Sequence, residues 1–311
     1  MEVYLAQPRG FCAGVDRAIS IVNMALQKFH APVYVRHEIV HNHHVVKELR
    51  EKGAIFIDNL EEIPTGAVTI FSAHGVSPAV RQEAAERNLR IIDATCPLVT
   101  KVHTEAKRYT KKGCHILLLG HRNHVEVEGT MGEAPNNINL IENLADLEKL
   151  NIPPEQPIAI LTQTTLAVDD TQIIIEAIKK RFPNVIQPQS KDICFATTNR
   201  QKAVKELAKT CDLILVVGSP TSSNSNRLAE VARSRGVKSL LIDDVTELNS
   251  QDLQNVQKLG ITAGASAPEF VVQNLLNWLR KHYPTEIHTI DVGSEEASFS
   301  IAKNLLSPEL L

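Results

Sequence analysis

The sequence predicts an α/β protein made of three repeated lobes, each with its own parallel sheet. Apolar runs of strand length alternate with stretches of helical periodicity along most of the 311 residues, which is the pattern of βαβ units. A cysteine followed by a helical stretch recurs three times, at Cys12, Cys96 and Cys194. The spacing between these cysteines is roughly the size of a small α/β domain. We therefore expect one lobe for each cysteine.

Each repeat begins at its cysteine, passes through a helical stretch and reaches a strand that ends on polar residues. In chain order, the predicted helix and strand of the three repeats are residues 16–28 and 33–40, 101–112 and 115–119, and 200–209 and 213–217. Ligands of parallel sheets bind beyond the carboxyl ends of the strands. The polar residues that follow these strands are therefore the candidates for function.

The second half of each repeat recurs as well. A pattern of two apolar residues, an acidic residue, a polar residue and an apolar residue precedes a last strand and a polar turn at residues 56–60, 140–144 and 241–245. We predict lobes that span residues 14–95, 96–193 and 194–283. The opening strand, residues 3–6, is expected to join the third lobe's sheet, so that residues 1–13 belong to this lobe. Residues 284–311 have no counterpart and are treated as a C-terminal tail.

Composition and charge predict a globular protein without a general affinity for nucleic acid. The chain is 43% hydrophobic and 22% charged, with 33 Lys and Arg against 36 Asp and Glu. Because no basic stripe is present, nucleic acid is not an expected partner. The N-terminus lacks a basic leader and no apolar run reaches membrane-spanning length, so we expect a cytoplasmic protein without membrane contact.

The five cysteines separate into two groups by their positions. An odd number of cysteines and a reducing cytoplasm make structural disulfides improbable. A single cysteine most often fills the core, but the triplicate placement of Cys12, Cys96 and Cys194 favours a shared metal site, around a pseudo-threefold axis if the lobes pack in a ring. Cys114 and Cys211 lie where strands begin, and the first repeat has no cysteine there. We expect these two to be core thiols.

Three thiolates leave one position of a four-coordinate site open, as in reactive rather than structural metal centres. The soft ligand set suits zinc or an iron–sulfur cluster. The sequence has neither the usual zinc spacing nor a Cys-x2-Cys run. Ligands from three separate lobes also suit a large cubane better than one small ion. The residues thus favour a cluster but leave zinc open.

A set of polar residues recurs beside the cysteines. Two corresponding groups follow the strands of the three repeats, namely His41, His124 and the pair Ser222 and Asn224, and His74, Thr164 and Ser266. Isolated histidines in loops are usually solvated, but six corresponding polar loop ends are harder to explain in this way. Neutral donors and histidines at helix N-termini can bind an anion. We therefore expect a site for a phosphate or a diphosphate.

Glu126 is the acidic residue with the strongest claim to a catalytic role, because it lies two residues from His124 in an otherwise neutral set. An acid in the first turn of a helix is often simply solvated, and we prefer that explanation for Glu128. For Glu126, the anion and the open metal position would both affect protonation. A role as proton donor is therefore expected.

These residues lie in motifs that resemble the 4-hydroxy-3-methylbut-2-enyl diphosphate reductase family, which performs the last step of the non-mevalonate isoprenoid pathway. The resemblance covers most of the chain, and its motifs follow the family order. They are Arg9-Gly10-Phe11-Cys12-Ala13-Gly14-Val15, Ser72-Ala73-His74-Gly75, Asp93-Ala94-Thr95-Cys96-Pro97, Glu126-Val127-Glu128-Gly129-Thr130, Thr162-Gln163-Thr164-Thr165, Ala196-Thr197-Thr198-Asn199-Arg200-Gln201, Ser222-Ser223-Asn224-Ser225-Asn226 and Thr262-Ala263-Gly264-Ala265-Ser266.

The resemblance implies a trefoil of three α/β lobes around a [4Fe–4S] cluster, held by the three repeated cysteines and with one iron free of protein ligands. It implies reductive removal of an allylic hydroxyl, giving isopentenyl and dimethylallyl diphosphate and water. Electrons would come one at a time from a ferredoxin or a flavodoxin. The resemblance assigns proton transfer to Glu126 and Thr164. It assigns substrate binding to His41, His74, His124, Thr165, Ser222, Ser223, Asn224 and Ser266.

Two other functions fit part of the same pattern. Quinolinate synthase-like proteins also place one cluster cysteine in each of three lobes, and fold alone does not separate the two enzymes. The Glu126 motif and the polar loop residues favour the reductase. A zinc-stabilised phosphate-binding protein without catalytic activity would be colourless, so an anaerobic absorption spectrum distinguishes it from both enzymes.

Overall fold

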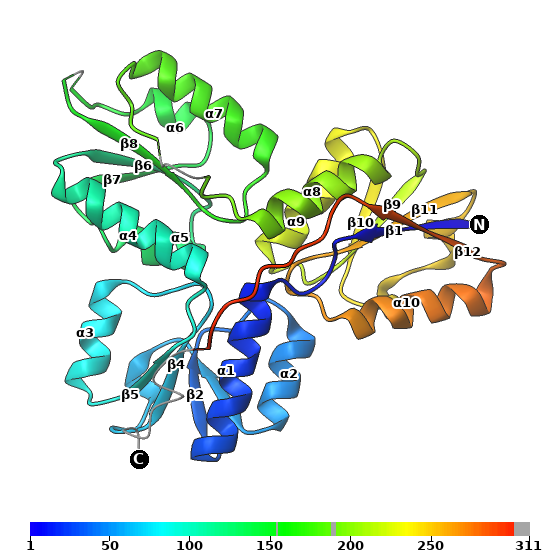
Figure 1. Cartoon of the computed structure of the whole chain (residues 1–311), viewed down its shortest axis with the longest axis horizontal. Coiled ribbons are helices and arrows are strands. Elements are labelled where there is room, and N and C mark those ends of the chain that lie inside the picture. The colour runs from blue at the N-terminus through cyan, green and yellow to red at the C-terminus, as the bar shows by residue number, and fades with distance from the viewer. Residues whose placement is uncertain (154, 188–190, 302–311) are drawn as a thin grey trace. The chain divides into compact units, whose positions relative to one another are not determined.

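A computed structural model describes residues 1–153, 155–187 and 191–301 of the chain. Two compact units are present, one formed by Met1–Asp16, His41–Val46 and Phe195–Ser298, the other by Arg17–Val40, Lys47–Cys194 and the segment from Phe299. Both units consist of parallel sheets with helices packed on them (Figure 1). None of the helices in the described ranges combines the length and the apolar character needed to cross a membrane.

The first unit contains a five-stranded parallel sheet in the order β10-β9-β11-β1-β12. Its strands are β1 (Glu2–Gln7), β9 (Leu213–Val217), β10 (Lys238–Ile242), β11 (Lys258–Ala263) and β12 (Glu286–Asp291). Leu213 and Leu215 pack with α10 (Glu269–His282) on one face. Ile214 and Val216 pack with α8 (Phe195–Leu207) and α9 (Ser223–Ser234) on the other. A strand buried on both faces is apolar throughout, which makes β9 recognisable in the sequence.

The second unit contains two parallel sheets. The four-stranded sheet has the order β3-β2-β4-β5, with β2 (Val33–Arg36), β3 (Ala54–Ile57), β4 (Val68–Phe71) and β5 (Arg90–Asp93). Ala84 of α3 (Pro78–Glu86) packs with Phe71 of β4 on one face. On the other face lie α1 (Ala13–Phe29) and α2 (His43–Glu51) (Figure 1). A short 3-10 helix, η1 (Leu60–Glu62), follows β3.

The three-stranded sheet of this unit has the order β7-β6-β8. Its strands are β6 (His115–Leu119), β7 (Ile138–Ile141) and β8 (Ile158–Thr162). Val102 of α4 (Pro97–Lys111) and Val127 of α5 (Val125–Met131) pack on one face. Leu147 of α6 (Leu144–Glu148) and Ile178 of α7 (Val168–Arg181) pack on the other.

Two further 3-10 helices, η2 (Val245–Glu247) and η3 (Ser250–Leu253), belong to the first unit.

The three sheets share one plan, so the chain has the three α/β lobes that the sequence predicts. Three of the strands in each sheet follow the same order, β3-β2-β4, β7-β6-β8 and β10-β9-β11. The segment before each cysteine lies beside the last of these strands: β1 pairs with β11, β5 pairs with β4, and Ile186 forms a bridge with Ala159 of β8. The pseudo-threefold arrangement and the lobe boundaries at 14–95, 96–193, 194–283 and 284–311 stay predictions.

Several predicted elements have different bounds in the structure. The strand predicted at residues 33–40 is β2, and it ends at Arg36. His37 has a φ of 58°, a left-handed conformation that interrupts an extended strand. The helices after the cysteines begin earlier than predicted, at Ala13, Pro97 and Phe195. Proline is favoured at the first position of a helix, so Pro97 marks the true start of α4. Strand β12 lies in the predicted tail and pairs with β1.

Candidate active site

The predicted site residues share one kind of position. Each lies in the first turn of a helix or within the four residues before a helix, and all but Cys194 follow a named strand of the structure. Backbone N–H groups at a helix N-terminus are free to bind an anion. The local fold therefore places these polar residues where an anion could bind, and their role in binding stays a prediction.

Each of the three repeated cysteines directly precedes a helix. Cys12 precedes α1, Cys96 is the N-cap residue of α4, and Cys194 precedes α8. The backbone N–H of Asp16 donates to the Cys12 carbonyl at 3.0 Å, and that of Thr100 donates to the Cys96 carbonyl at 2.9 Å. A helix N-terminus stabilises a thiolate, the form that binds metal. All three cysteines are partly exposed.

Cys114 and Cys211 have different surroundings. They are 2% and 6% exposed and pack in the cores of the second and third lobes. Burial, assisted by the charge of Asp212, raises the pKa of the Cys211 thiol to about 12. A thiol that stays protonated is a poor ligand. The burial of both thiols shows that Cys114 and Cys211 are core residues, as the sequence predicts.

Glu126 and Thr164 form a buried pair in the second unit. Glu126 is 3% exposed. The backbone N–H of Thr164 donates to Glu126 Oε1 at 2.7 Å, and the Thr164 hydroxyl donates to Oε2 at 2.9 Å. Burial raises the pKa of Glu126 to about 7, against the opposing effect of both Thr164 hydrogen bonds, and the charge of Asp192 raises it further. Near neutral pH, this carboxyl can both hold and release a proton.

Backbone hydrogen bonds tie two of the cysteines to the polar loops of the second unit. The N–H of Cys194 donates to the Thr164 carbonyl at 3.0 Å. The N–H of Cys96 donates to the carbonyl of Ala73, the neighbour of His74, at 2.9 Å. Each of these cysteines is thus positioned by a loop that also carries a predicted site residue.

The histidines of the second unit complete this group. The rings of His74 and His124 lie 6.0 Å apart, edge to face. His124 Nδ1 accepts a hydrogen bond of 3.1 Å from the backbone N–H of Glu126, so His124 caps the helix that carries the acid. The Thr165 hydroxyl accepts a hydrogen bond of 3.0 Å from Gln163. The second unit therefore brings together His74, Cys96, His124, Glu126, Thr164, Thr165 and Cys194.

The other predicted residues lie together in the first unit. The hydroxyl of Ser266 donates to the His41 carbonyl at 2.9 Å, and Ser222 Oγ lies 3.4 Å from the same hydroxyl oxygen. The N–H of Cys12 donates to the carbonyl of Ala265, beside Ser266, at 3.2 Å. Cys12, His41, Ser222 and Ser266 thus meet at the carboxyl ends of β9 and β11.

Asn224 in the first turn of α9 carries a buried donor that lacks a partner. Its side chain is 4% exposed, and its Oδ1 atom accepts a hydrogen bond of 3.4 Å from Thr197. Its Nδ2 atom is buried and makes no hydrogen bond to any described residue. An unpaired buried donor costs about 1–3 kcal/mol. This atom is therefore ready to bind an acceptor such as a phosphate oxygen, and Ser223 lies next to it in the same turn.

Arg200 has a structural role that the sequence analysis did not assign. Its side chain is fully buried, and Nη2 donates to the carbonyls of Gly10 at 2.7 Å and Phe11 at 3.3 Å. Its charge is balanced by Glu295, whose Oε1 lies 2.9 Å from Nη1. Arg200 therefore holds the backbone just before Cys12. The only sequence signal is its place in the motif at residues 196–201.

Asp192 is a second residue whose role sequence analysis missed. Its carboxylate is fully buried; Oδ1 lies 2.9 Å from Lys101 Nζ, and Oδ2 accepts a hydrogen bond of 3.1 Å from the N–H of Thr162. Burial raises the pKa of Asp192, against the opposing effect of Lys101. Asp192 joins α4 to β8 two residues before Cys194. In the sequence, the position of Asp192 in the opening segment of the third repeat was the signal that could have indicated its role.

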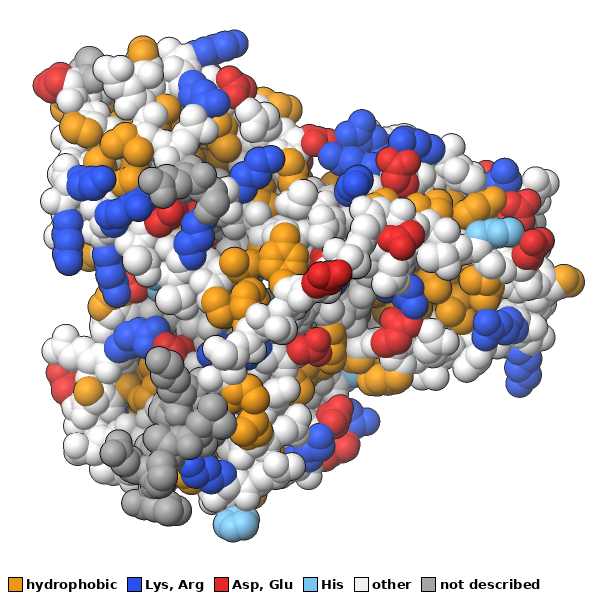
Figure 2. Space-filling model, in the orientation of Figure 1, with side chains coloured by type: hydrophobic (Ala, Val, Ile, Leu, Met, Phe, Trp, Pro, Cys, Tyr) orange, Lys and Arg blue, Asp and Glu red, His pale blue; other side chains and the backbone are white. Residues whose placement is uncertain are grey.

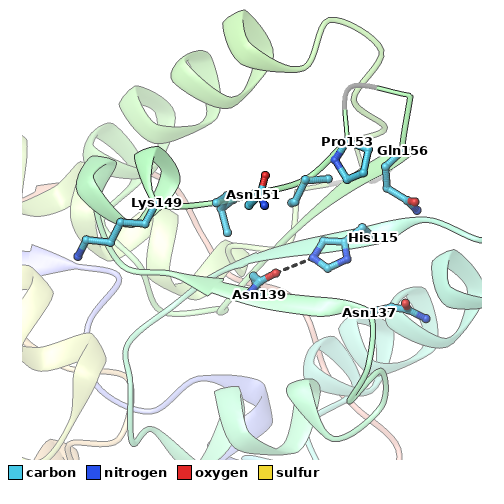
Figure 3. A pocket seen from close by; sticks show the side chains of 9 residues that line it. His115, Asn137, Asn139, Lys149, Asn151, Pro153 and Gln156 are labelled. Carbon is cyan, nitrogen blue, oxygen red and sulfur yellow. Dashed lines mark hydrogen bonds between the residues drawn. The ribbon is translucent and has the colours of Figure 1, made fainter.

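A separate pocket of about 320 Å³ lies at the opposite end of the three-stranded sheet (Figure 3). His115, the first residue of β6, lines it with Asn139, and His115 Nε2 lies 2.6 Å from Asn139 Oδ1. Parallel sheets bind ligands at the carboxyl ends of their strands. The pocket contains no predicted site residue, so it is not part of the candidate active site.

Sequence comparisons identify relatives along almost the whole chain. Residues 3–280 match the family described as LytB protein. A protein of Actinobacillus succinogenes named 4-hydroxy-3-methylbut-2-enyl diphosphate reductase is 52% identical over 308 residues, which cover 98% of each chain. A protein of Neisseria gonorrhoeae with the same name is 57% identical over 279 residues, which cover 89% of this chain and 87% of the relative.

Solved structures give the same result. The E-1-hydroxy-2-methyl-but-2-enyl-4-diphosphate reductase from Plasmodium falciparum is 42% identical, with a TM-score of 0.96 and coverage of 98% of this chain and 96% of that one. A second structure, of the reductase described as the terminal enzyme of the non-mevalonate pathway, is 29% identical, with a TM-score of 0.65 and coverage of 90% and 99%. The chain therefore belongs to the LytB protein family, whose matched relatives carry the name 4-hydroxy-3-methylbut-2-enyl diphosphate reductase.

Proposed function

We propose that this protein is a 4-hydroxy-3-methylbut-2-enyl diphosphate reductase. The reaction removes an allylic hydroxyl: two electrons and two protons enter, the C–O bond breaks, and one water leaves with isopentenyl or dimethylallyl diphosphate. The observation that carries this proposal is the buried Glu126 carboxyl, held by Thr164 and with its pKa raised to about 7. A leaving hydroxyl needs an acid of this kind close to neutral pH.

The cysteines present fit a [4Fe–4S] cluster with one iron free of protein ligands. Cys12, Cys96 and Cys194 are partly exposed thiols at helix N-termini, whereas the remaining two cysteines are buried in cores. Three thiolates can hold three of the four irons of such a cluster. When bound, the cluster would supply electrons and a Lewis-acidic iron for cleavage of the C–O bond.

The polar loops would hold the substrate's diphosphate. Imidazole, hydroxyl and amide donors at helix N-termini suit its oxygens. Asn224 Nδ2 would gain the partner that it lacks among the described residues. We assign substrate binding to His41, His74, His124, Thr165, Ser222, Ser223, Asn224 and Ser266.

Glu126 would deliver the proton, and Thr164 would hold the acid in position. The Thr164 hydroxyl contacts Glu126 Oε2, so a proton can pass between the two oxygens along this hydrogen bond. Because Glu126 is buried, bulk water does not compete for its proton.

The electron donor would be a small one-electron carrier protein such as a ferredoxin or a flavodoxin, in the cytoplasm. On the face shown in Figure 2, Lys and Arg side chains gather over the lobe of the three-stranded sheet. Helix α4 of this lobe carries the exposed Lys107 and Lys111, whereas its Lys101 pairs with the buried Asp192. A basic surface accelerates association with an acidic partner. This face is therefore our candidate for the docking of a donor.

Anaerobic turnover tests the proposed function. The purified protein is expected to be brown and, with a chemical one-electron reductant, to convert 4-hydroxy-3-methylbut-2-enyl diphosphate into the two five-carbon diphosphates. Product is measured by chromatography alongside the iron and sulfide content. A colourless, zinc-containing protein that binds the diphosphate without converting it would contradict the proposal.

Replacement of Asn224 with alanine tests the diphosphate site. A hydrogen bond to a charged group contributes about 1.5–3 kcal/mol, so KM for the substrate is expected to rise about ten- to a hundredfold. Iron content should not change. Its unfolding temperature should change little, because the variant removes a buried donor that has no partner in the described part of the free protein together with the long, 3.4 Å hydrogen bond from Thr197 to Oδ1. Asn277→Ala, at an exposed position of α10, is the control. An unchanged KM with a lower unfolding temperature would assign Asn224 to structure alone.

A further inference from the structure

A cluster of two histidines and an aspartate lies in the first unit and includes none of the cysteines or the residues assigned to substrate. His43 and His44 open α2, and Asp243 follows β10, 200 residues from His43 along the chain. One potential ligand atom from each of the three residues lies within 4.8 Å of the other two. The two imidazole rings are 4.0 Å apart. The fold thus gathers three metal-ligating groups that sequence spacing does not associate.

Two atoms of this cluster lack a partner. His44 Nε2 and Asp243 Oδ1 are buried and form no hydrogen bond with any residue in the described ranges. The contact between His43 and Asp243 involves neither of these two atoms, because it joins His43 Nδ1 to Asp243 Oδ2. His44 Nε2 lies 4.0 Å from Asp244 Oδ2, beyond hydrogen-bond distance. Unpaired buried polar atoms are unfavourable, and a bound cation would satisfy both.

We propose that His43, His44 and Asp243 bind one divalent transition-metal ion of the zinc class. Two imidazole nitrogens and a carboxylate oxygen form a known ligand set of open, four-coordinate zinc sites, in which water is the fourth ligand. Tetrahedral coordination with bonds of about 2.0–2.2 Å places the ligand atoms about 3.3–3.6 Å apart. The observed spread of up to 4.8 Å requires only small side-chain rotations. Magnesium and calcium prefer oxygen ligands, so the two imidazoles disfavour them.

The position of the cluster allows an ion to enter and gives it a structural effect. The His43 side chain is 53% exposed, whereas those of His44 and Asp243 are 18% and 15% exposed. A bound ion would therefore sit at the surface with two of its ligands shielded. It would link the first turn of α2 to the carboxyl end of β10 and so anchor the segment that also contains His41.

Equilibrium dialysis of the anaerobic holoenzyme against zinc tests this proposal, with zinc and iron measured together. The wild-type protein is expected to bind one zinc ion per chain without loss of iron. Even the loss of a residue that only supports a ligand weakens a metal site about 10–100-fold. His44→Ala and Asp243→Asn should each weaken zinc binding by at least this factor. Their unchanged iron content would show that they fold.

His37→Ala is the matched control. His37 Nδ1 lies 2.9 Å from Asp58 Oδ1. Among the described residues, no third potential metal ligand joins this imidazole–carboxylate pair. Zinc binding should be the same in this variant as in the wild-type protein. Equal zinc binding in the wild-type, His44→Ala and Asp243→Asn proteins would overturn the proposal, as would zinc uptake that displaces iron to the same extent in all of them.

A spectroscopic measurement identifies the ligands independently. Copper(II) added to the holoenzyme is expected to show electron paramagnetic resonance hyperfine structure from two imidazole nitrogens, and from one in His43→Ala. A spectrum with oxygen ligands alone in the wild-type protein would overturn the assignment.

Discussion

Serine in place of Cys12, Cys96 or Cys194 is expected to remove the iron–sulfur cluster and abolish turnover. A serine hydroxyl is a much weaker ligand for iron than a thiolate, and each of these cysteines is partly exposed and directly precedes a helix, unlike the two buried core thiols. Iron content, sulfide content and visible absorbance of anaerobically purified variants provide the measurement. We expect each quantity to fall close to zero in all three variants.

Cys114→Ser and Cys211→Ser are the matched controls for this experiment. Both thiols are buried, so the serine hydroxyl would need a new hydrogen-bond partner, and we expect a loss of about 1–3 kcal/mol in the free energy of unfolding. Their iron content should equal that of the wild-type protein. Normal iron in any of the first three variants, or iron loss confined to a control, would contradict the ligand assignment.

Glu126→Gln is expected to lower kcat by about 10²–10⁴-fold with little change in substrate binding. Glutamine has the size of glutamate and can still accept the hydrogen bond from the Thr164 N–H, but it cannot donate the proton that the leaving hydroxyl needs. Single-turnover measurements on the anaerobic variant separate the two effects, because substrate binding changes the visible spectrum before product forms. Iron content should not change.

The pH dependence of the wild-type protein follows from the same carboxyl. Burial raises its pKa to about 7, so the protonated, donating form predominates below that pH. We expect kcat to fall as pH rises through about 7, and Glu126→Gln to lack this transition. The free energy of unfolding should also fall as pH rises, because a carboxyl with a raised pKa in the folded state disfavours folding once it ionises. Relative to Glu126→Gln, the wild-type protein should lose stability between about pH 4.5 and pH 7.

Glu128→Gln controls for the loss of a negative charge from the same helix. Glu128 is exposed in α5, two residues from Glu126. The kcat, the pH profile and the unfolding temperature of the Glu128→Gln variant should match those of the wild-type protein. Near-normal product formation by Glu126→Gln with intact substrate binding would exclude Glu126 as the proton donor and direct attention to Thr164 or the diphosphate.

The sequence by itself determined the repeat and the class of each lobe. Strands β6 and β9 have the predicted bounds, because a strand buried on both faces is a continuous apolar run. The sequence also separated Cys114 and Cys211, which lie where strands begin, from the three cysteines that precede helices, because the position of a residue relative to the next strand or helix is a local property. Helix starts were less accurate, since α1, α4 and α8 begin directly after the cysteines, at Ala13, Pro97 and Phe195.

Only the tertiary structure decided which side chains meet. The Glu126–Thr164 contact spans 38 residues, and the burial that raises the pKa of Glu126 comes from packing around both. Edge strand β12, the Arg200–Glu295 pair and the cluster of His43, His44 and Asp243 likewise join segments 95 or more residues apart in sequence. Desolvation and side-chain pairing depend on these long-range contacts, which local periodicity does not encode.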